Sequence, residues 1–291
     1  MTRPRHRGGA FRRPGRGVDR PGGERVVATE GCRGHPPSLQ AVPCPPYPVP
    51  RSPKAGLPWP PPRTPRYLSI MVSLFDILGP TMVGPSSSHT AGACRLGLIT
   101  RAIAGGTPTR VRIQLHGSFA ATGEGHGTHR AIVGGLVGLA PDDLRLREAY
   151  DEARAAGLEW GFEEIDLGDD AHPNTAIFHV AIGDEQLVVR GASLGGGRVE
   201  VSEIDGFPVS LGGGYHTLVL LAHDEPGTIA CVATIMAGHH VNLATMRVDR
   251  TGRHQDALMT IEADEPVNEA ALGAIRSFPW LRWARAVPKI A

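Results

Sequence analysis

Strand-like and helix-like segments alternate in a regular order at the C-terminal end of the 291-residue chain, and this order constrains the fold most strongly. Both helix-like segments open with proline, which suits the first helical position because no N–H is needed there. The sequence predicts strands at 217–222, 241–248, 256–262 and 280–287, and helices at 226–238 and 266–278.

A strand–helix–strand–strand–helix–strand order is typical of a ferredoxin-like module. The preceding Leu211-Gly-Gly-Gly214 reads as a flexible joint, because glycine-rich segments have little conformational preference. We therefore expect a βαββαβ module over 215–291. This fold hosts many activities, so it does not fix the function.

The segment 71–211 has a mixed pattern, which makes the whole chain α/β (α+β). A helix is expected from Thr90 to Ala104, capped by Ser88 or Thr90 and ended by Gly105-Gly106. Gly183-Asp184 predicts a tight hairpin between two strands. The remaining expected elements are helices at 128–139 and 142–156, the second exposed, and strands at 111–115, 176–182, 186–190 and 198–204.

Residues 1–70 differ sharply from the rest of the chain. They hold 16 of the 26 prolines, and 12 Arg and one Lys against three acids, a net +10 that leaves −9 of the total +1 for the remainder. Such a segment buries too little apolar surface to fold. Three interpretations stay open: a disordered basic tail or proline-rich ligand, a transit peptide, or an over-extended reading frame whose true start is Met71. We favour the third.

The acidic body argues against nucleic acid or anionic membrane as a partner. No apolar run is long enough for a spanning helix, and the N-terminus lacks a secretory signal. The four cysteines, at 32, 44, 94 and 231, match neither a disulfide framework nor a zinc site. A reducing, cytoplasmic setting is expected.

The densest chemical feature is Gly84-Pro-Ser-Ser-Ser-His-Thr90, directly before a predicted helix. A helix start with free N–H groups and hydroxyls suits a carboxylate or phosphate. A simple N-cap needs one hydroxyl, whereas this motif offers four hydroxyls and an imidazole. We expect Ser86, Ser87, Ser88 and Thr90 to bind substrate and His89 to be catalytic.

A second cluster, His116-Gly-Ser-Phe-Ala-Ala-Thr-Gly-Glu-Gly-His-Gly-Thr128, joins a strand to a helix. Its glycines let the backbone approach a ligand closely, which makes Thr122 and Gly123 candidate binding residues. His126 lies in the glycine turn with little to pack on, so a catalytic role is favoured. His116 is as well explained by a structural role.

Two weaker motifs follow, His172-Pro-Asn174 in a turn and Ser193-Leu-Gly-Gly-Gly197 between strands. Each is also ordinary turn or bulge chemistry. With the first two clusters they place histidines and hydroxyls at element ends, where α/β sites assemble. No Ser–His–Asp order or zinc-protease motif supports hydrolysis.

From Ser73-Leu-Phe-Asp76 and Gly84–Thr90 onward, the sequence resembles iron–sulfur-dependent L-serine dehydratase. The motifs at 122–126, 172–174 and 193–197 follow in that family's order, and the resemblance covers residues 71–291. It implies a domain at 71–211 related to the allosteric substrate-binding domain of phosphoglycerate dehydrogenase, followed by an ACT domain.

The family converts L-serine to pyruvate and ammonia with a [4Fe–4S] cluster that acts as Lewis acid on the hydroxyl, while a base takes the α-proton. In its two-chain form an alpha chain holds the cluster cysteines, so the few cysteines here imply the beta chain and no metal ligand of its own. The resemblance makes His89, His126 and His172 candidates for base and substrate contact, and Asn174, Ser87, Ser88 and Ser193 candidates for binding polar groups of the substrate.

ACT domains bind amino acids at paired interfaces, so pairing through this module is expected. The resemblance makes His223, Asp224, Gly227 and Asn242 candidate ligand contacts. Two alternatives remain open. One is a non-catalytic amino-acid-sensing subunit, and the other is a proline-rich adaptor that acts through residues 1–70.

Overall fold

The computed structural model describes residues 80–290, which belong to one compact unit. The predictions for residues 1–70 and for a start at Met71 lie outside the described residues. Two sheets organise the described part of the chain, one between residues 110 and 211 and the other between 216 and 287.

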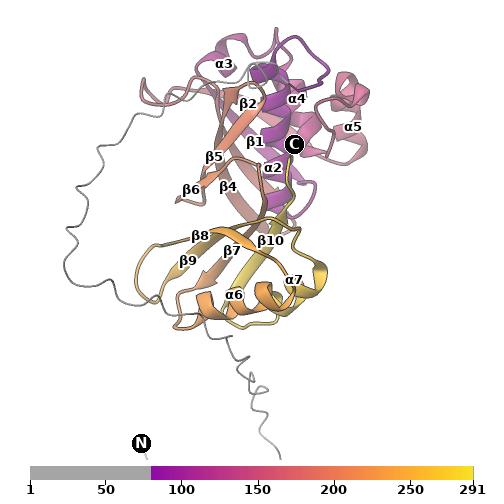
Figure 1. Ribbon diagram of the computed structural model, residues 1–291. Coiled ribbons are helices and arrows are strands. Elements are labelled where there is room, and N and C mark those ends of the chain that lie inside the picture. Colours follow the sequence, from indigo (N-terminus) through magenta and orange to yellow (C-terminus); the bar gives the residue numbers. More distant parts are fainter. Residues whose placement is uncertain (1–79, 291) are drawn as a thin grey trace, which may run out of the picture. The chain divides into compact units, whose positions relative to one another are not determined.

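The first sheet has six strands in the order β2-β1-β3-β4-β5-β6 (Figure 1). β1 and β2 are parallel, because the chain between them crosses over through helices, and all other neighbours are antiparallel. The strands are β1 (Arg110–His116), β2 (Glu159–Ile165), β3 (Thr175–Ile182), β4 (Glu185–Gly195), β5 (Arg198–Ile204) and β6 (Phe207–Leu211).

A π-helical turn, η1 (Ser87–Gly92), continues directly into α2 (Ala93–Ala104), which contacts β3, β4 and β5. α2 packs closely on α4 (Thr128–Leu136), since a Cβ on Gly97 would lie 2.4 Å from the Ile132 carbonyl oxygen. This backbone contact leaves no room for side chains between the two helices, which lie side by side in Figure 1.

The second sheet has the order β10-β7-β9-β8, antiparallel throughout. Its leucines, methionines and alanines form a core with the two helices. The elements are β7 (His216–His223), α6 (Thr228–Gly238), β8 (Leu243–Arg250), β9 (Asp256–Ala263), α7 (Glu269–Arg276) and β10 (Leu281–Val287). The predicted ferredoxin-like βαββαβ order is confirmed, and both helices begin two or three residues after the prolines.

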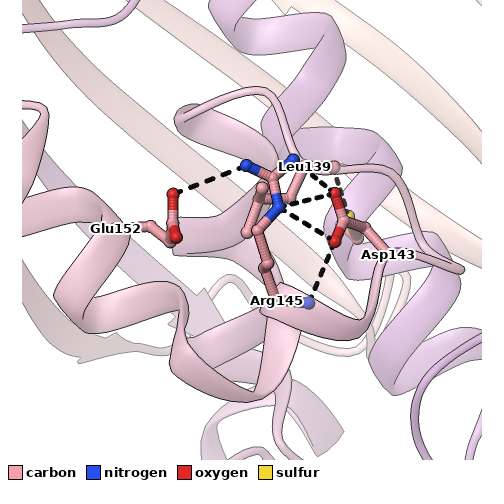
Figure 2. A network of polar contacts seen from close by, with 5 residues as sticks. Leu139, Asp143, Arg145 and Glu152 are labelled. Atoms are coloured by element: carbon pink, nitrogen blue, oxygen red, sulfur yellow. Dashed lines mark hydrogen bonds and ion pairs between the residues drawn. The ribbon is translucent and has the colours of Figure 1, made fainter.

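The single exposed helix predicted at 142–156 is wrong. The segment forms a 3-10 turn, η2 (Leu144–Glu148), and a short helix, α5 (Ala149–Ala155), with Leu146, Ala149 and Ala153 buried. Figure 2 shows the polar contacts at the start of this segment: the Asp143 carboxylate accepts bonds from the Arg145 backbone (2.9 Å) and guanidinium (2.6 Å), while Glu152 lies on the other side of that guanidinium. Asp143 is thus the N-cap of η2, so the helical run begins at Leu144 and not at Asp142.

β2 and β6 were not predicted, and α3 (Ser118–Thr122) lies where a loop was expected. β2 contains Gly161 and several glutamates, so its sequence alone does not resemble a strand, and its place in the sheet comes from pairing with β1. β4 extends past the predicted 186–190 and includes Ser193. The N-cap of the helical run is Ser86, not Ser88 or Thr90, because the Ser86 side chain accepts the His89 N–H.

The glycine joint is packed at its centre. Gly213 is buried with a positive φ of 72°, and its carbonyl accepts the Ile290 N–H at 2.9 Å. None of the helices between residues 80 and 290 combines the length and apolar character needed to cross a bilayer.

Candidate functional site

Hydrogen bonds join the four sequence motifs in one place. His89 of η1 lies 3.2 Å from the Ser118 hydroxyl, and the Phe119 N–H donates to the Pro173 carbonyl at 3.3 Å. Next in the chain, Asn174 and Ser193 exchange bonds: the Ser193 N–H donates to the Asn174 carbonyl, and the Asn174 amide to the Ser193 carbonyl. The Ser193 hydroxyl then donates to the Ser88 carbonyl at 2.9 Å, which returns the network to η1.

His89 lies at the centre of this network. The residue is 9% exposed, with Nδ1 3.1 Å from the Ser88 hydroxyl and Nε2 3.2 Å from the Thr122 hydroxyl. It packs edge-on against Phe119 and faces the His126 ring at a centroid distance of 5.1 Å. Single-turn π-helical segments are frequent at functional sites, and η1 is such a segment.

Burial lowers the pKa of His89 from its ordinary value, and the nearby His126 lowers it further, while a backbone hydrogen bond at Ser118 acts in the opposite direction. The ring is therefore neutral near pH 7. A neutral imidazole can accept or donate a proton, which suits general acid–base chemistry.

The hydrogen bonds of the other two histidines fix which ring nitrogen carries the proton. His126 Nδ1 lies 3.0 Å from the Thr122 carbonyl, which can only accept, so the lone pair of the neutral ring is on Nε2. His172 is the reverse, because its Nδ1 accepts the Asn174 N–H at 3.1 Å and its Nε2 then bears the proton. His126 is exposed and His172 half-buried.

Ser193 is fully buried beneath η1, so its hydroxyl supports the Ser88 backbone and does not face solvent. A Cβ on Gly92 would lie 2.0 Å from the Ser193 Oγ, which shows how closely η1 and β4 approach. Asn174 Oδ1 is buried and accepts no hydrogen bond from the described residues. An acceptor of this kind is suited to a donor supplied by a ligand.

The remaining predicted residues lie around this centre. Ser86 caps η1 and is 3.3 Å from the Ser88 hydroxyl, and Ser87 is half-buried in the same turn. The Thr90 hydroxyl donates to the His126 carbonyl at 3.3 Å. Gly123 is buried and its carbonyl accepts the Thr128 N–H, so it shapes the turn without facing a ligand.

His116 lies away from the other histidines. It is 8% exposed, and its Nδ1 contacts the Ile165 carbonyl at 3.3 Å and the Leu167 N–H at 3.2 Å at the end of β2. Of the two roles left open by the sequence, the structural one fits.

Ser118 was missed as a site residue, although it contributes one of the hydroxyls at His89 Nε2. The available signal was its spacing of four residues from Thr122, which places both hydroxyls on one side of a helical turn. α3 makes this spacing effective, and its sequence was read as a loop.

A cleft of about 430 Å³ opens beside His126. Gly84, Pro85 and Thr90 line one part of it, while residues 124–127 and 129–131 with Tyr150 line another. Its charged groups include Glu124, Arg130 and Arg147. The cleft reaches His126, whereas His89 is not among the residues that line it.

In the second module, a cleft of about 530 Å³ lies at the start of α6 and includes Asp224 and Gly227. The Arg250 guanidinium, 2.8 Å away, and the His254 N–H hold the pKa of Asp224 below its usual range. The other two candidates do not line this cleft. The Asn242 side chain bonds to Asp264 at 2.7 Å, and the His223 N–H donates to the Trp280 carbonyl.

Comparison with known proteins identifies the family of the chain. Residues 73–159 match the model of the serine dehydratase beta chain, and residues 216–279 match that of the ACT domain. The chain is 42% identical over 209 residues to a probable L-serine dehydratase beta chain of Bacillus subtilis (71% of this chain, 94% of that one). It is 38% identical over 205 residues to the L-serine dehydratase beta chain of Peptoniphilus asaccharolyticus (70% and 92%).

The chain also aligns with D-3-phosphoglycerate dehydrogenase of Synechocystis, at 27% identity over 197 residues, which is 66% of this chain and 35% of that protein. The extent and identity of the beta-chain matches place the protein in a family. It belongs to the L-serine dehydratase beta chains and carries a C-terminal ACT domain.

Proposed function

We propose that this chain is the catalytic beta partner in the elimination of water from L-serine, which yields pyruvate and ammonia once the aminoacrylate product hydrolyses. The observation that carries the proposal is the neutral, doubly hydrogen-bonded His89 facing His126 where four motifs meet. The beta-chain relatives supply the reaction class, since their names refer to L-serine dehydratase.

The α-proton of serine would be taken by one of the two facing rings. His126 Nε2 offers an exposed lone pair, and His89 is the neutral ring beside it, whereas His172 presents an N–H at Nε2. His172 would therefore donate to a substrate oxygen. Asn174 Oδ1 is an unused acceptor suited to the substrate ammonium, and the hydroxyls of Ser86, Ser87, Ser88, Thr90 and Thr122 would orient the remaining polar groups.

The [4Fe–4S] cluster implied by the family does not fit the cysteines that the structure describes. A cluster takes three or four thiolates. Burial raises the pKa of Cys94 to about 12, and its thiol donates to the Leu139 carbonyl, while Cys231 lies in the other module. Within residues 80–290 no three His, Cys, Asp or Glu side chains are grouped to hold a metal. We assign the cluster to a separate alpha chain.

Anaerobic co-expression with a candidate cluster-bearing chain tests the function. Pyruvate should form from L-serine with both chains present, and from neither chain alone. If the cluster is present in the co-expressed pair and no pyruvate forms from L-serine, the proposal is contradicted. Threonine assayed in parallel reports the substrate preference.

The ACT domain would be the regulatory part and would mediate pairing of two copies. We expect the protein to be located in the cytoplasm. Supporting features for the pairing are the position of β8 at the edge of its sheet and the exposed Ile229 on α6. The cleft with Asp224 and Gly227 also favours a second candidate, a non-catalytic amino-acid sensor. If that alternative holds, replacing His89 will leave turnover intact in the reconstituted pair and change only the response to added serine.

A further inference from the structure

A cleft of about 780 Å³ lies along α2, and none of the candidate site histidines lines it. One wall is the outer side of α2 with the 140–142 loop, and the other is α7, β10 and the residues after β10. Leu98, Ala102, Leu272 and Ile290 supply apolar surface. This volume is within the range usual for small-molecule sites.

Positive charge gathers in this cleft, although residues outside 1–70 carry a net −9. Its lining has two carboxylates, Asp142 and Glu269, against five cations: Arg95, Arg101, Arg276, Arg285 and Lys289. These cations come from α2, α7, β10 and the C-terminal residues, so they are not the solvated face of a single helix. The fold brings them together from segments far apart in the sequence.

Carboxylates neutralise only part of this charge. Arg285, with 18% of its side chain exposed, is 2.6 Å from Glu185, and the exposed Arg276 is 3.8 Å from Glu269. Arg101 donates from Nε to the neutral Thr107 hydroxyl at 3.1 Å. Neither Arg101 nor Lys289 forms an ion pair with a carboxylate among residues 80–290.

The C-terminal end of α2 opposes an anion, because a helix C-terminus carries a partial charge of about −0.5. Arg101 and Lys289, which pair with no carboxylate among the described residues, exceed that charge by themselves. Arg285 also packs closely on the backbone of Gly105, since a Cβ added to that glycine would lie 2.5 Å from the Arg285 Nε. Fixed guanidinium groups favour planar, multiply charged oxyanions.

We propose that this cleft binds a small multiply charged anion, either a phosphate ester or a polycarboxylate. The site is separate from the histidine site and from the cleft at the start of α6. Its residues come from both modules, so an occupant would contact α2 and the ACT domain together.

Isothermal titration of the full chain with citrate and with inorganic phosphate, at constant ionic strength, tests the proposal. We expect saturable binding of one of them, and the tighter one identifies the polycarboxylate or the phosphate class. Arg101→Gln with Arg276→Gln should weaken binding at least about tenfold, because charge-assisted bonds are lost.

Arg198→Gln is the matched control, because Arg198 is exposed on β5, outside the cleft, and forms no ion pair with the described residues. The basic segment 1–70 is the same in every variant, so its charge cancels in the comparison. Glu269→Gln removes a carboxylate from the lining and should tighten anion binding. Because a misfolded variant would bind more weakly, tighter binding cannot be caused by misfolding. Absent saturable binding, an equal loss in Arg198→Gln, or weaker binding in Glu269→Gln would overturn the proposal.

Discussion

The two ends of the helical run Ser87–Ala104 have opposite surroundings. At the N-terminal end, His89 is buried, neutral and enclosed by hydroxyls from its own module. At the C-terminal end, the helix stops at Gly105 against Arg285 of the ACT domain and borders an open, cationic cleft. The same helical run thus has a neutral imidazole at one end and an excess of positive charge at the other. One helix can therefore contribute to two sites of different chemistry.

The sharpest test of the N-terminal end is His89→Asn. In the reconstituted pair we expect a loss of kcat of about 10²–10⁴-fold, the usual contribution of a positioned acid–base group. Pyruvate formation from serine measures it. His179→Gln is the control: its pKa is also lowered by burial, but it bonds to Gln114 on the sheet and should leave turnover unchanged. An unchanged kcat in His89→Asn would contradict an acid–base role for the N-terminal end of the helical run.

Gly97→Ala tests whether both ends depend on the same scaffold. The new Cβ would lie 2.4 Å from the Ile132 carbonyl oxygen and 3.0 Å from the Gly135 Cα, so α2 and α4 must separate. We expect the free energy of unfolding to fall by about 1–3 kcal/mol, the cost of overpacking. Denaturant titration measures this. An unchanged midpoint would mean that the two helices are not in backbone contact in solution.

The pH dependence tests whether the N-terminal end is electrostatically neutral. Because the pKa of folded His89 lies below the ordinary value of 6.5, the stability contributed by its neutral form is complete above about pH 6.5. It declines as the pH falls from there to the folded pKa. The difference in unfolding free energy between wild type and His89→Asn, measured across this window, reports it.

NMR titration of the His89 ring separates the causes of this shift. His126→Gln should raise the pKa of His89, because one of the two lowering influences is removed, while burial remains. A His89 ring that titrates at or above 6.5 in the wild type would contradict the buried, neutral site.

The smallest expected effect is at α7, beside the cationic cleft. Gly273 is helical, and a Cβ there would meet no atom within 4 Å. Gly273→Ala should raise the free energy of unfolding by about 0.5–1 kcal/mol, because alanine loses less backbone entropy. A destabilised variant would show that the glycine is contacted in solution, for example by a second copy.

The sequence predicted most of the regular elements, including the full order of the ACT domain, because periodic apolar residues and opening prolines are local signals. It failed where structure depends on a neighbour. β2 is recognisable only through its pairing with β1.

For the candidate site, the motifs could be predicted but the contacts could not. The glycines, serines and histidines at 84–90 and 116–128 marked the right segments. Nothing local indicated that Ser118 would reach His89 or that Ser193 would support Ser88 across 105 positions. Those distances depend on sheet order and on how closely η1 lies on β4.

The sequence alone determined the βαββαβ order, the mixed class of the preceding module and the hydroxyl-rich start of the α2 run, because turn residues, caps and periodicity act within a few positions. The tertiary structure alone decided which ends of these elements meet. The proton positions on His126 and His172 follow from bonds at Thr122 and Asn174, and the cationic cleft from the packing of β10 on α2. Hydrogen bonding and charge density depend on distance in space, and only the folded chain sets that distance.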